Sequence, residues 1–242
     1  MTEKQAQRPT NWLVPAALLL IAALLAVLVI FQLRGDPQPV AEAPPGEAAE
    51  FGGIPERVPE LAQLERRDEA DVQSAGSVHA PLTMVVYSDY QCPFCARWNQ
   101  ETLPAIMDYV DDGSLRIEWR DINMYGEPSE RASLAAHAAG LQGKYWEYHN
   151  ALFADGETRD EGDLSADALV ELAADLGLDT ERFAADMESE ELLEQNQQTA
   201  AEGRSIGVTG TPTFVLDARP IVGAQPTEFF SRVIDTALEE RQ

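Results

Sequence analysis

The chain is poor in cysteine, histidine and positive charge, and each shortage excludes a class of protein. Its 242 residues include two cysteines and three histidines, too few for a disulfide-stapled secreted scaffold or a four-cysteine zinc site. The 17 basic residues face 42 acidic ones, and a net charge of −25 argues against binding nucleic acid or anionic lipid through charge. We expect no metal and no cofactor. Because 45% of the chain is hydrophobic, it is not a disordered acidic tail.

One long stretch lacks charge altogether. No charged residue lies between Arg8 and Arg34, and residues 12–33 read WLVPAALLLIAALLAVLVIFQL. A helix of this length can span the ~30 Å hydrocarbon core of a bilayer. We therefore expect an uncleaved transmembrane anchor within 1–34 rather than a signal peptide, whose apolar region would be shorter. Lys4 and Arg8 precede the stretch and acidic residues follow it, which predicts a cytoplasmic N-terminus.

The segment after this stretch is rich in proline, alanine and glutamate. Residues 35–56 contain five prolines, and such a composition stays extended and solvated. We interpret it as a linker that holds a folded domain, residues 57–242, away from the membrane. The sequence then predicts a single-pass protein of a bacterial plasma membrane, with its folded domain outside the cytoplasm.

Strand and helix patterns alternate at the start of the folded domain. Residues 82–87 (LTMVVY) form an apolar run typical of a buried strand, and 115–120 (LRIEWR) alternate with the period of a strand. Between them, one helix is expected from Pro93 to Gly113. A strand, a helix and a strand in this order favour a parallel pair with a right-handed crossover.

Helices dominate the middle of the domain, and a hairpin follows them. The region of about 123–206 has no good strand pattern and is expected to be a helical insertion. The patterns predict helices over 129–141, 144–153, 165–176, 180–187, 190–206 and 228–239, strands over 213–216 and 220–222, and more weakly a helix over 58–67. This order indicates an α/β fold with a helical block inserted midway.

Both cysteines fall in one motif, Cys92-Pro93-Phe94-Cys95. The motif follows a buried strand and begins a helix, and Pro93 suits the first helical position because its missing N–H would have had no partner there. Cys92 then lies at the helix N-terminus, where free N–H groups and the helix dipole stabilise a thiolate, the form that attacks a disulfide. Cys95, one turn later, is close enough to form a disulfide with Cys92 and is expected to be less exposed.

Two other uses of the cysteine pair compete with redox chemistry. Half of a zinc site would need further ligands, but His79, His137 and His149 lack metal-ligand spacing. An inert structural disulfide would close a very short loop and stabilise little. Redox-active use fits the residues best. A non-catalytic membrane-tethered module that binds metal or a client, and a tethered holdase for unfolded exported chains, stay open as alternatives.

Three segments together resemble the DsbA-like branch of the thioredoxin superfamily. They are SDYQCPFCARW after the apolar strand, KYWEYHNALF in the helical insertion and GVTGTPTFVL before the hairpin. The resemblance runs from about residue 80 to the C-terminus and implies a thioredoxin-like fold. It also implies that Cys92 is the attacking thiol and Cys95 the resolving thiol, and that the Thr211–Pro212 bond is cis and lies against them.

A proline and an aromatic residue complete the expected substrate site. Pro212 has no N–H to bind a nearby sulfur, and a cis bond would leave the backbone of Thr211 free to pair with a substrate strand. Phe94, which forms the active-site dipeptide with Pro93, is the best candidate for an exposed apolar contact. Tyr90 is a further candidate for this apolar patch.

Two positions depart from the family pattern. Relatives often carry an acidic residue six positions before the first cysteine, where this chain has Val86, and strong oxidases tend to have histidine in place of Phe94. Asp89 is closer to the cysteines in sequence, but we expect it on the loop after the strand, facing elsewhere. These departures leave the direction of the redox reaction open.

The residues and the resemblance together predict a membrane-anchored, extracytoplasmic thiol–disulfide oxidoreductase. Disulfides form outside the cytoplasmic membrane, so oxidation of exported proteins is the favoured direction, and a reductase or an isomerase is the alternative. Its partners would be reduced or misoxidised exported proteins. The resemblance also implies reoxidation by a DsbB-like or vitamin-K-epoxide-reductase-like (VKOR-like) membrane protein.

Overall fold

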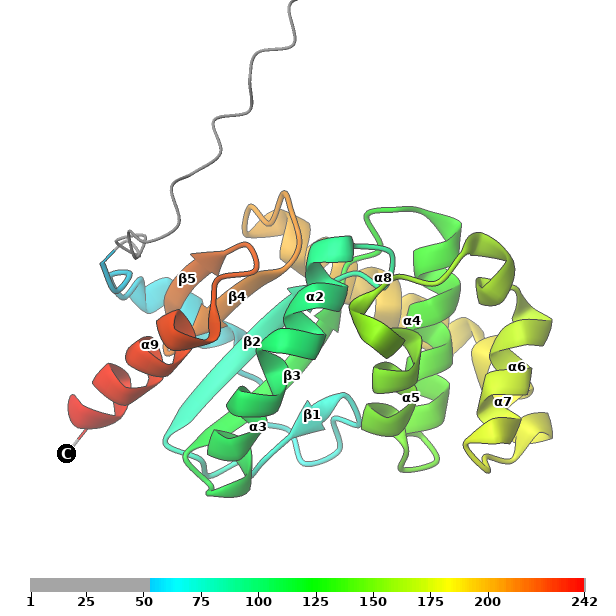
Figure 1. The fold of residues 1–242 in the computed structure, drawn as a ribbon, viewed down its shortest axis with the longest axis horizontal. Coiled ribbons are helices and arrows are strands. Elements are labelled where there is room, and N and C mark those ends of the chain that lie inside the picture. Colours follow the sequence, from blue (N-terminus) through cyan, green and yellow to red (C-terminus); the bar gives the residue numbers. More distant parts are fainter. Residues whose placement is uncertain (1–52, 242) are drawn as a thin grey trace, which may run out of the picture. The chain divides into compact units, whose positions relative to one another are not determined.

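The computed structural model describes residues 53–241, so the expected membrane anchor and most of the expected linker lie outside the described residues. Within 53–241, no helix has the length and apolar character needed to cross a bilayer. The centre of this part is a five-stranded sheet with the strand order β1-β3-β2-β4-β5 (Figure 1). The strands are β1 (Ser74–Ala75), β2 (Leu82–Ser88), β3 (Leu115–Asp121), β4 (Thr213–Leu216) and β5 (Arg219–Val222).

The two central strands form the parallel pair that the strand–helix–strand pattern predicts. Leu82 lies opposite Leu115, and Ser88 opposite Asp121 at the other end of the pair. Every residue of both strands is buried. β4 is antiparallel to β2, and β5 and β1 are antiparallel to β4 and β3. The carboxyl ends of β2 and β3 therefore meet at one edge of the sheet, where the chain leaves β2 to enter the cysteine motif.

The helix expected over 93–113 is in fact two helices, α2 (Pro93–Glu101) and α3 (Leu103–Asp111). The break falls at Thr102, because Pro104 is the second residue of α3. A proline has no N–H to donate to the carbonyl four residues earlier, and its ring clashes with that carbonyl. The prediction of a single helix was wrong because it followed the apolar spacing and overlooked this proline.

Helices fill the chain between β3 and β4, as the sequence predicts. They are α4 (Glu127–Gly140), α5 (Tyr145–Leu152), α6 (Ala166–Asp175), α7 (Thr180–Met187) and α8 (Glu190–Ser205), with short 3₁₀ turns η2 (Ala154–Gly156) and η3 (Glu161–Leu164). Ser165, Asp179 and Ser189 cap α6, α7 and α8, since each side chain accepts a hydrogen bond from a backbone N–H of the first turn. Helices α4 to α7 lie on the side of the sheet away from β5 and α9 (Thr227–Glu239) (Figure 1).

Both faces of the sheet are covered. One face carries Met84, Val86 and Trp119, which pack in the main core with residues of α2, α3, α4, α5 and α9. The other carries Val85 and Tyr87, which pack with residues of α8 and of the 3₁₀ helix η1 (Pro59–Leu64). Alternate residues of β3 therefore lie on the two faces of the sheet, and both faces are buried. β1 was not predicted, because two residues are too few to make a pattern.

Candidate active site

The cysteine motif begins α2 at the carboxyl end of β2. Cys92 is the N-cap residue, Pro93 is the first helical residue, and the N–H of Cys95 donates to the carbonyl of Cys92 at 3.0 Å. Both cysteines are free, and each residue is only 1% exposed. The expected difference in exposure between Cys92 and Cys95 is therefore absent. The two sulfurs differ in how strongly burial and hydrogen bonds act on each of them.

The two thiols differ strongly in acidity. The pKa of Cys92 falls from 9.0 to about 6, mainly because Cys95 donates a hydrogen bond to its sulfur. Burial raises this pKa, whereas hydrogen bonds from the side chain of Thr211 and from the backbone N–H groups of Cys95 and Phe94 lower it further. Burial raises the pKa of Cys95 well above its ordinary value, and the adjacent Cys92 raises it further. At neutral pH this favours a thiolate at Cys92 beside a protonated Cys95, which is the arrangement of a nucleophile and its resolving partner.

The loop before β4 lies against Cys92. Its Thr211–Pro212 peptide bond is cis. The protonated thiol of Cys92 donates to the carbonyl oxygen of Thr211 at 3.2 Å, across 119 residues of sequence. The carbonyl of Pro212 accepts from the N–H of Gly223 at 2.8 Å, which ties this loop to the end of β5. The structure thus brings Thr211 and Pro212 to the cysteine pair.

Exposed apolar side chains lie in the cysteine motif and in the loop that follows β3. Phe94 is 52% exposed, and Met124 and Tyr125, in the loop between β3 and α4, are 47% and 53% exposed. Met124 and Tyr125 were not predicted, because an irregular loop has no periodicity to mark them. Tyr90 is buried and donates to or accepts from His149 Nδ1 at 2.9 Å. The expectation that Tyr90 extends the apolar patch was therefore wrong.

Asp89 lies on the loop after β2, with its carboxylate turned toward the loop that follows β3. The carboxylate is fully buried and accepts four hydrogen bonds. Its donors are the N–H of Gln91 (2.7 Å), the hydroxyl of Ser129 (2.6 Å), and the N–H groups of Met124 (2.5 Å) and Tyr125 (3.2 Å). Asp89 therefore joins the loop before Cys92 to the loop that carries the exposed Met124 and Tyr125.

A second buried acid lies at the end of β3 and was not singled out from the sequence. Val86 is buried and supplies no acid, whereas Asp121, in register with Ser88, has a fully buried carboxylate. Burial, reinforced by the charge of Asp89, raises the pKa of Asp121 to about 7. Its donors are neutral, Trp119 Nε1 at 3.0 Å and Gln73 Nε2 at 3.1 Å. Among residues 53–241, no arginine or lysine forms an ion pair with it.

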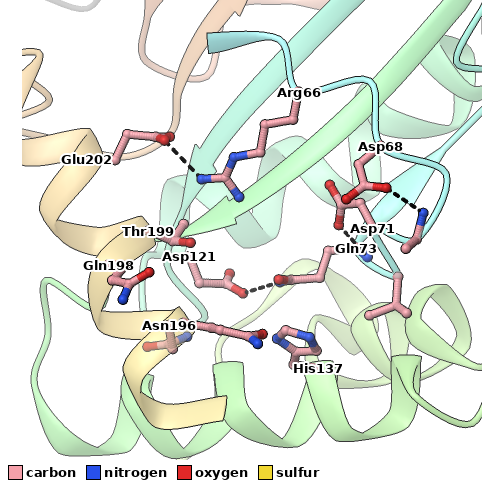
Figure 2. A pocket seen from close by; sticks show the side chains of 13 residues that line it. Arg66, Asp68, Asp71, Gln73, Asp121, His137, Asn196, Gln198, Thr199 and Glu202 are labelled. Atoms are coloured by element: carbon pink, nitrogen blue, oxygen red, sulfur yellow. Dashed lines mark hydrogen bonds and ion pairs between the residues drawn. The ribbon is translucent and has the colours of Figure 1, made fainter. Parts of the chain in front are cut away.

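Asp121 lines a polar cavity of about 430 Å³. Figure 2 shows Asp121 hydrogen-bonded to Gln73, with Arg66 bound to Glu202 across the cavity. The walls also include His137 of α4 and Asn196 of α8. No group of three or more histidine, cysteine, aspartate or glutamate side chains in the described part of the chain is placed to hold a metal ion.

His149 of α5 links the helical insertion to the cysteine helix. Burial lowers the pKa of His149 to about 3, so its ring is neutral. Asn99 Oδ1, on α2, can only accept, so His149 Nε2 donates to it at 2.7 Å and Nδ1 accepts from the hydroxyl of Tyr90. This histidine is a hydrogen-bonded core residue, and it holds α2 and the residue two positions before Cys92 in place.

Comparison with known families identifies the fold. A family model described as thioredoxin matches residues 69–236. The chain belongs to the thioredoxin family. Solved structures with the same fold include oxidised BdbD of Bacillus subtilis (22% identity, TM-score 0.62, covering 69% of this chain and 92% of that one) and a thioredoxin-like oxidoreductase of Silicibacter pomeroyi (30%, 0.60, 71% and 94%). The prediction of a DsbA-like thioredoxin fold is confirmed.

Relatives of this thioredoxin-family chain by sequence include proteins of two kinds. Probable disulfide bond formation protein D of Bacillus cereus is 24% identical over 146 residues, which are 58% of this chain and 68% of that protein. The Na⁺/H⁺ antiporter NhaA 1 of Salinispora arenicola is 29% identical over 224 residues, 90% of this chain. The chain spans only 31%, 25% and 24% of three such antiporters. The likeness to them therefore concerns a minor part of each antiporter.

Proposed function

We propose that this thioredoxin-family protein is a thiol–disulfide oxidoreductase that oxidises the thiols of exported proteins. The observation that carries the proposal is the contrast between two sulfurs one helical turn apart. Cys92 has a pKa of about 6, and the pKa of Cys95 is raised well above its ordinary value. A relative named for disulfide bond formation, and a structural neighbour titled an oxidoreductase, support the same activity.

The reaction begins from the Cys92–Cys95 disulfide. A substrate thiolate attacks the sulfur of Cys92, a mixed disulfide forms, and Cys95 leaves as a thiolate that takes up a proton because its pKa is high. A second substrate thiolate then attacks the substrate sulfur of the mixed disulfide, and Cys92 leaves. The substrate has lost two electrons and gained a disulfide, and the cysteine pair is reduced. The low pKa of Cys92 makes it a good leaving group, which favours this direction.

The surroundings of Cys92 suit an extended, partly apolar substrate segment. The backbone of Thr211 lies beside the sulfur, where a substrate strand would pair with it, and Pro212 offers no N–H to compete. Phe94, Met124 and Tyr125 are exposed next to this position and would contact apolar side chains of the segment. Unfolded exported chains present such segments, whereas folded proteins bury them.

The proposed location and partners of the protein rest on the sequence. Residues 12–33 would anchor the protein in a bacterial plasma membrane, with the N-terminus in the cytoplasm and the catalytic domain outside. Reduced or misoxidised exported proteins would be its clients there. A DsbB-like or VKOR-like membrane protein would return the cysteine pair to the disulfide.

The test is disulfide transfer from the oxidised full chain to a reduced, unfolded protein with several cysteines. We expect substrate thiols to disappear as the chain becomes reduced. When the same substrate is supplied in its disulfide-bonded form, the Cys92 thiolate of Cys95→Ala should attack a substrate disulfide, release the other substrate sulfur as a thiolate and accumulate as a mixed disulfide, which Cys92→Ala does not form. A reduction potential near −120 mV would agree with an oxidase. A potential near −270 mV, with disulfide reduction in place of transfer, would favour the reductase. Absence of any reversible couple would refute the enzyme and leave the binding module.

A further inference from the structure

We propose that His149 of the helical insertion is a positioning residue for the nucleophile, because it binds both the turn before Cys92 and the helix after it. The inference deepens the proposed function and rests on it only in taking Cys92 as the nucleophile. It gives the inserted helices a task in the chemistry, namely to fix the geometry on which the reactivity of Cys92 depends.

The turn that carries Cys92 is fastened to the helical insertion. The turn runs from Asp89 to Cys92, and the N–H of Cys92 closes it by donating to the carbonyl of Asp89 at 3.1 Å. The carboxylate of Asp89 accepts from the hydroxyl of Ser129, on α4, at 2.6 Å. Nε2 of Gln91 donates at 2.9 Å to the carbonyl of Arg159, which lies between η2 and η3. The position of Cys92 therefore depends on the inserted segment.

His149 makes a further connection of this kind, and it binds the cysteine motif on both sides. Its Nδ1 accepts from the hydroxyl of Tyr90, in the turn, at 2.9 Å, and its Nε2 donates to Oδ1 of Asn99, on α2, at 2.7 Å. The three residues are 0%, 2% and 7% exposed in the order His149, Tyr90 and Asn99. Because solvent is excluded here, the loss of either bond would leave a buried polar group without its partner.

Aromatic rings hold the imidazole of His149 in its orientation. The centroid of its ring lies 4.3 Å from that of Trp119, 5.2 Å from that of Phe153 and 5.3 Å from that of Trp146. The ring of Phe153 also stacks on that of Tyr90, with 5.0 Å between centroids. These contacts leave the imidazole little freedom to rotate, so its two hydrogen bonds keep a fixed direction.

The effect on Cys92 arises at the N-terminus of α2. Hydrogen bonds from the backbone N–H groups of Cys95 and Phe94 lower the pKa of Cys92, and such bonds weaken steeply when donor and acceptor are misaligned. The sulfur moves with the turn, whereas the N–H groups move with α2. Because His149 ties the turn to α2, we expect release of either of its bonds to misalign the sulfur and raise the pKa of Cys92.

The decisive variant is Tyr90→Phe in the full chain, which keeps the stacked ring and removes only the hydroxyl that bonds to His149. We expect the pKa of Cys92 to rise by about one unit and the glutathione equilibrium to shift about tenfold toward the disulfide, as for the loss of one hydrogen bond to a charged group. The pKa is measured from the pH dependence of alkylation by iodoacetamide.

Tyr148→Phe is the matched control. Tyr148 is buried on the same helix, α5, but its hydroxyl donates to the carbonyl of Leu169 on α6 at 2.8 Å. Both variants remove one buried hydroxyl, so we expect similar losses in the free energy of unfolding, about 1–3 kcal/mol. Only Tyr90→Phe should change the pKa of Cys92, which a purely structural role of the hydroxyl would not do.

Two substitutions of His149 separate its two bonds. Glutamine places its amide near the position of Nε2 and keeps the bond to Asn99, whereas asparagine places its amide near that of Nδ1 and keeps the bond to Tyr90. Each variant should therefore raise the pKa of Cys92. Adding Tyr90→Phe should raise it further in His149→Asn, but not in His149→Gln, where the same bond is already lost.

Two results would overturn the inference: a Cys92 pKa unchanged in Tyr90→Phe, or an equal rise in Tyr148→Phe. Its failure can be told apart from failure of the proposed function. Disulfide transfer by the wild type, with an unchanged Cys92 pKa in Tyr90→Phe, would remove the role of His149 and keep the oxidase. A raised pKa in Tyr90→Phe, without any disulfide transfer by the wild type, would keep the role of His149 and remove the oxidase.

Discussion

The strand β3 buries one carboxylate on each face of the sheet, and the two are in opposite states. On one face, Glu118 accepts hydrogen bonds from the guanidinium groups of Arg116 (3.0 Å) and Arg120 (2.8 Å) and from two backbone N–H groups. Burial alone would raise the pKa of Glu118, but these bonds outweigh it and the pKa is lowered. On the other face, Asp121 has only neutral donors, and burial raises its pKa to about 7.

Hydrogen-bonding and charged partners, rather than depth of burial, therefore decide whether these two buried acids are charged. Glu118 is a permanently charged part of an ion-pair network that joins β3 to the segment after η1. Asp121 stays titratable, and it lies at the sheet edge where the cysteine motif begins. Buried groups with perturbed pKa values and no opposite charge are common at functional sites, whereas buried ion pairs such as those of Glu118 support the structure.

The largest effect expected from this comparison is that of Glu118→Gln. Two buried guanidinium groups would lose their common partner, and we expect the free energy of unfolding to fall by about 3–5 kcal/mol in urea denaturation. Glu127→Gln is the control, because the pair of Glu127 with Arg131 is exposed and should contribute less than about 1 kcal/mol. Equal losses in the two variants would mean that the buried network is not special.

Asp121→Asn should have the opposite effect on stability from Glu118→Gln. The folded pKa of about 7 lies above the ordinary 3.8, so the folded state favours the proton. The contribution of Asp121 to stability is therefore fully present below about pH 4 and is lost as the pH rises to about 7. The amide cannot ionise, so the variant should be more stable at pH 8 by up to about 4 kcal/mol and lose this pH dependence. Unfolding curves across this pH range measure it. Parallel pH profiles for the two proteins would contradict the raised pKa.

The smallest effect concerns the cysteine pair, whose two sulfurs have different pKa values. Alkylation of Cys92 in the reduced protein should rise with pH around a midpoint near 6, while Cys95 stays unreactive there. Because the hydrogen bond from Cys95 is the main cause of this low pKa, Cys95→Ala should move the midpoint upward. Mass spectrometry of the alkylated peptides assigns the reaction to each sulfur. A midpoint that does not move would assign the low pKa to Thr211 and to the backbone N–H groups at the helix N-terminus.

Local patterns predicted most elements that build the site. The apolar run of β2, the proline after Cys92 and the turn before β4 are short-range signals, and each was read correctly from neighbouring residues. The family resemblance alone predicted that Thr211 lies at the site, since no pattern in the sequence connects it to Cys92 across 119 residues. The break at Thr102 was missed although its cause, Pro104, is local.

The surroundings of Asp89, Asp121 and Tyr125 could not be predicted, because they come from contacts between segments that are distant in the sequence. Asp89 meets Tyr125 across 36 residues, and Asp121 meets Gln73 across 48. Whether a carboxylate on a strand is buried, and whether an arginine reaches it, depends on which loops fold over that strand. The alternating residues of β3 give no sign that Glu118 is paired and Asp121 is not.

The break at Thr102 divides the cysteine helix from everything that follows it. The influence of a helix on a charge at its N-terminus fades within about one turn, so α2 alone determines that contribution at Cys92. The residues of α3 are then constrained mainly by the apolar side chains that they place in the core, such as Ile106 and Val110. In evolution or in engineering, α3 is free to vary in sequence without retuning the chemistry of the cysteine pair.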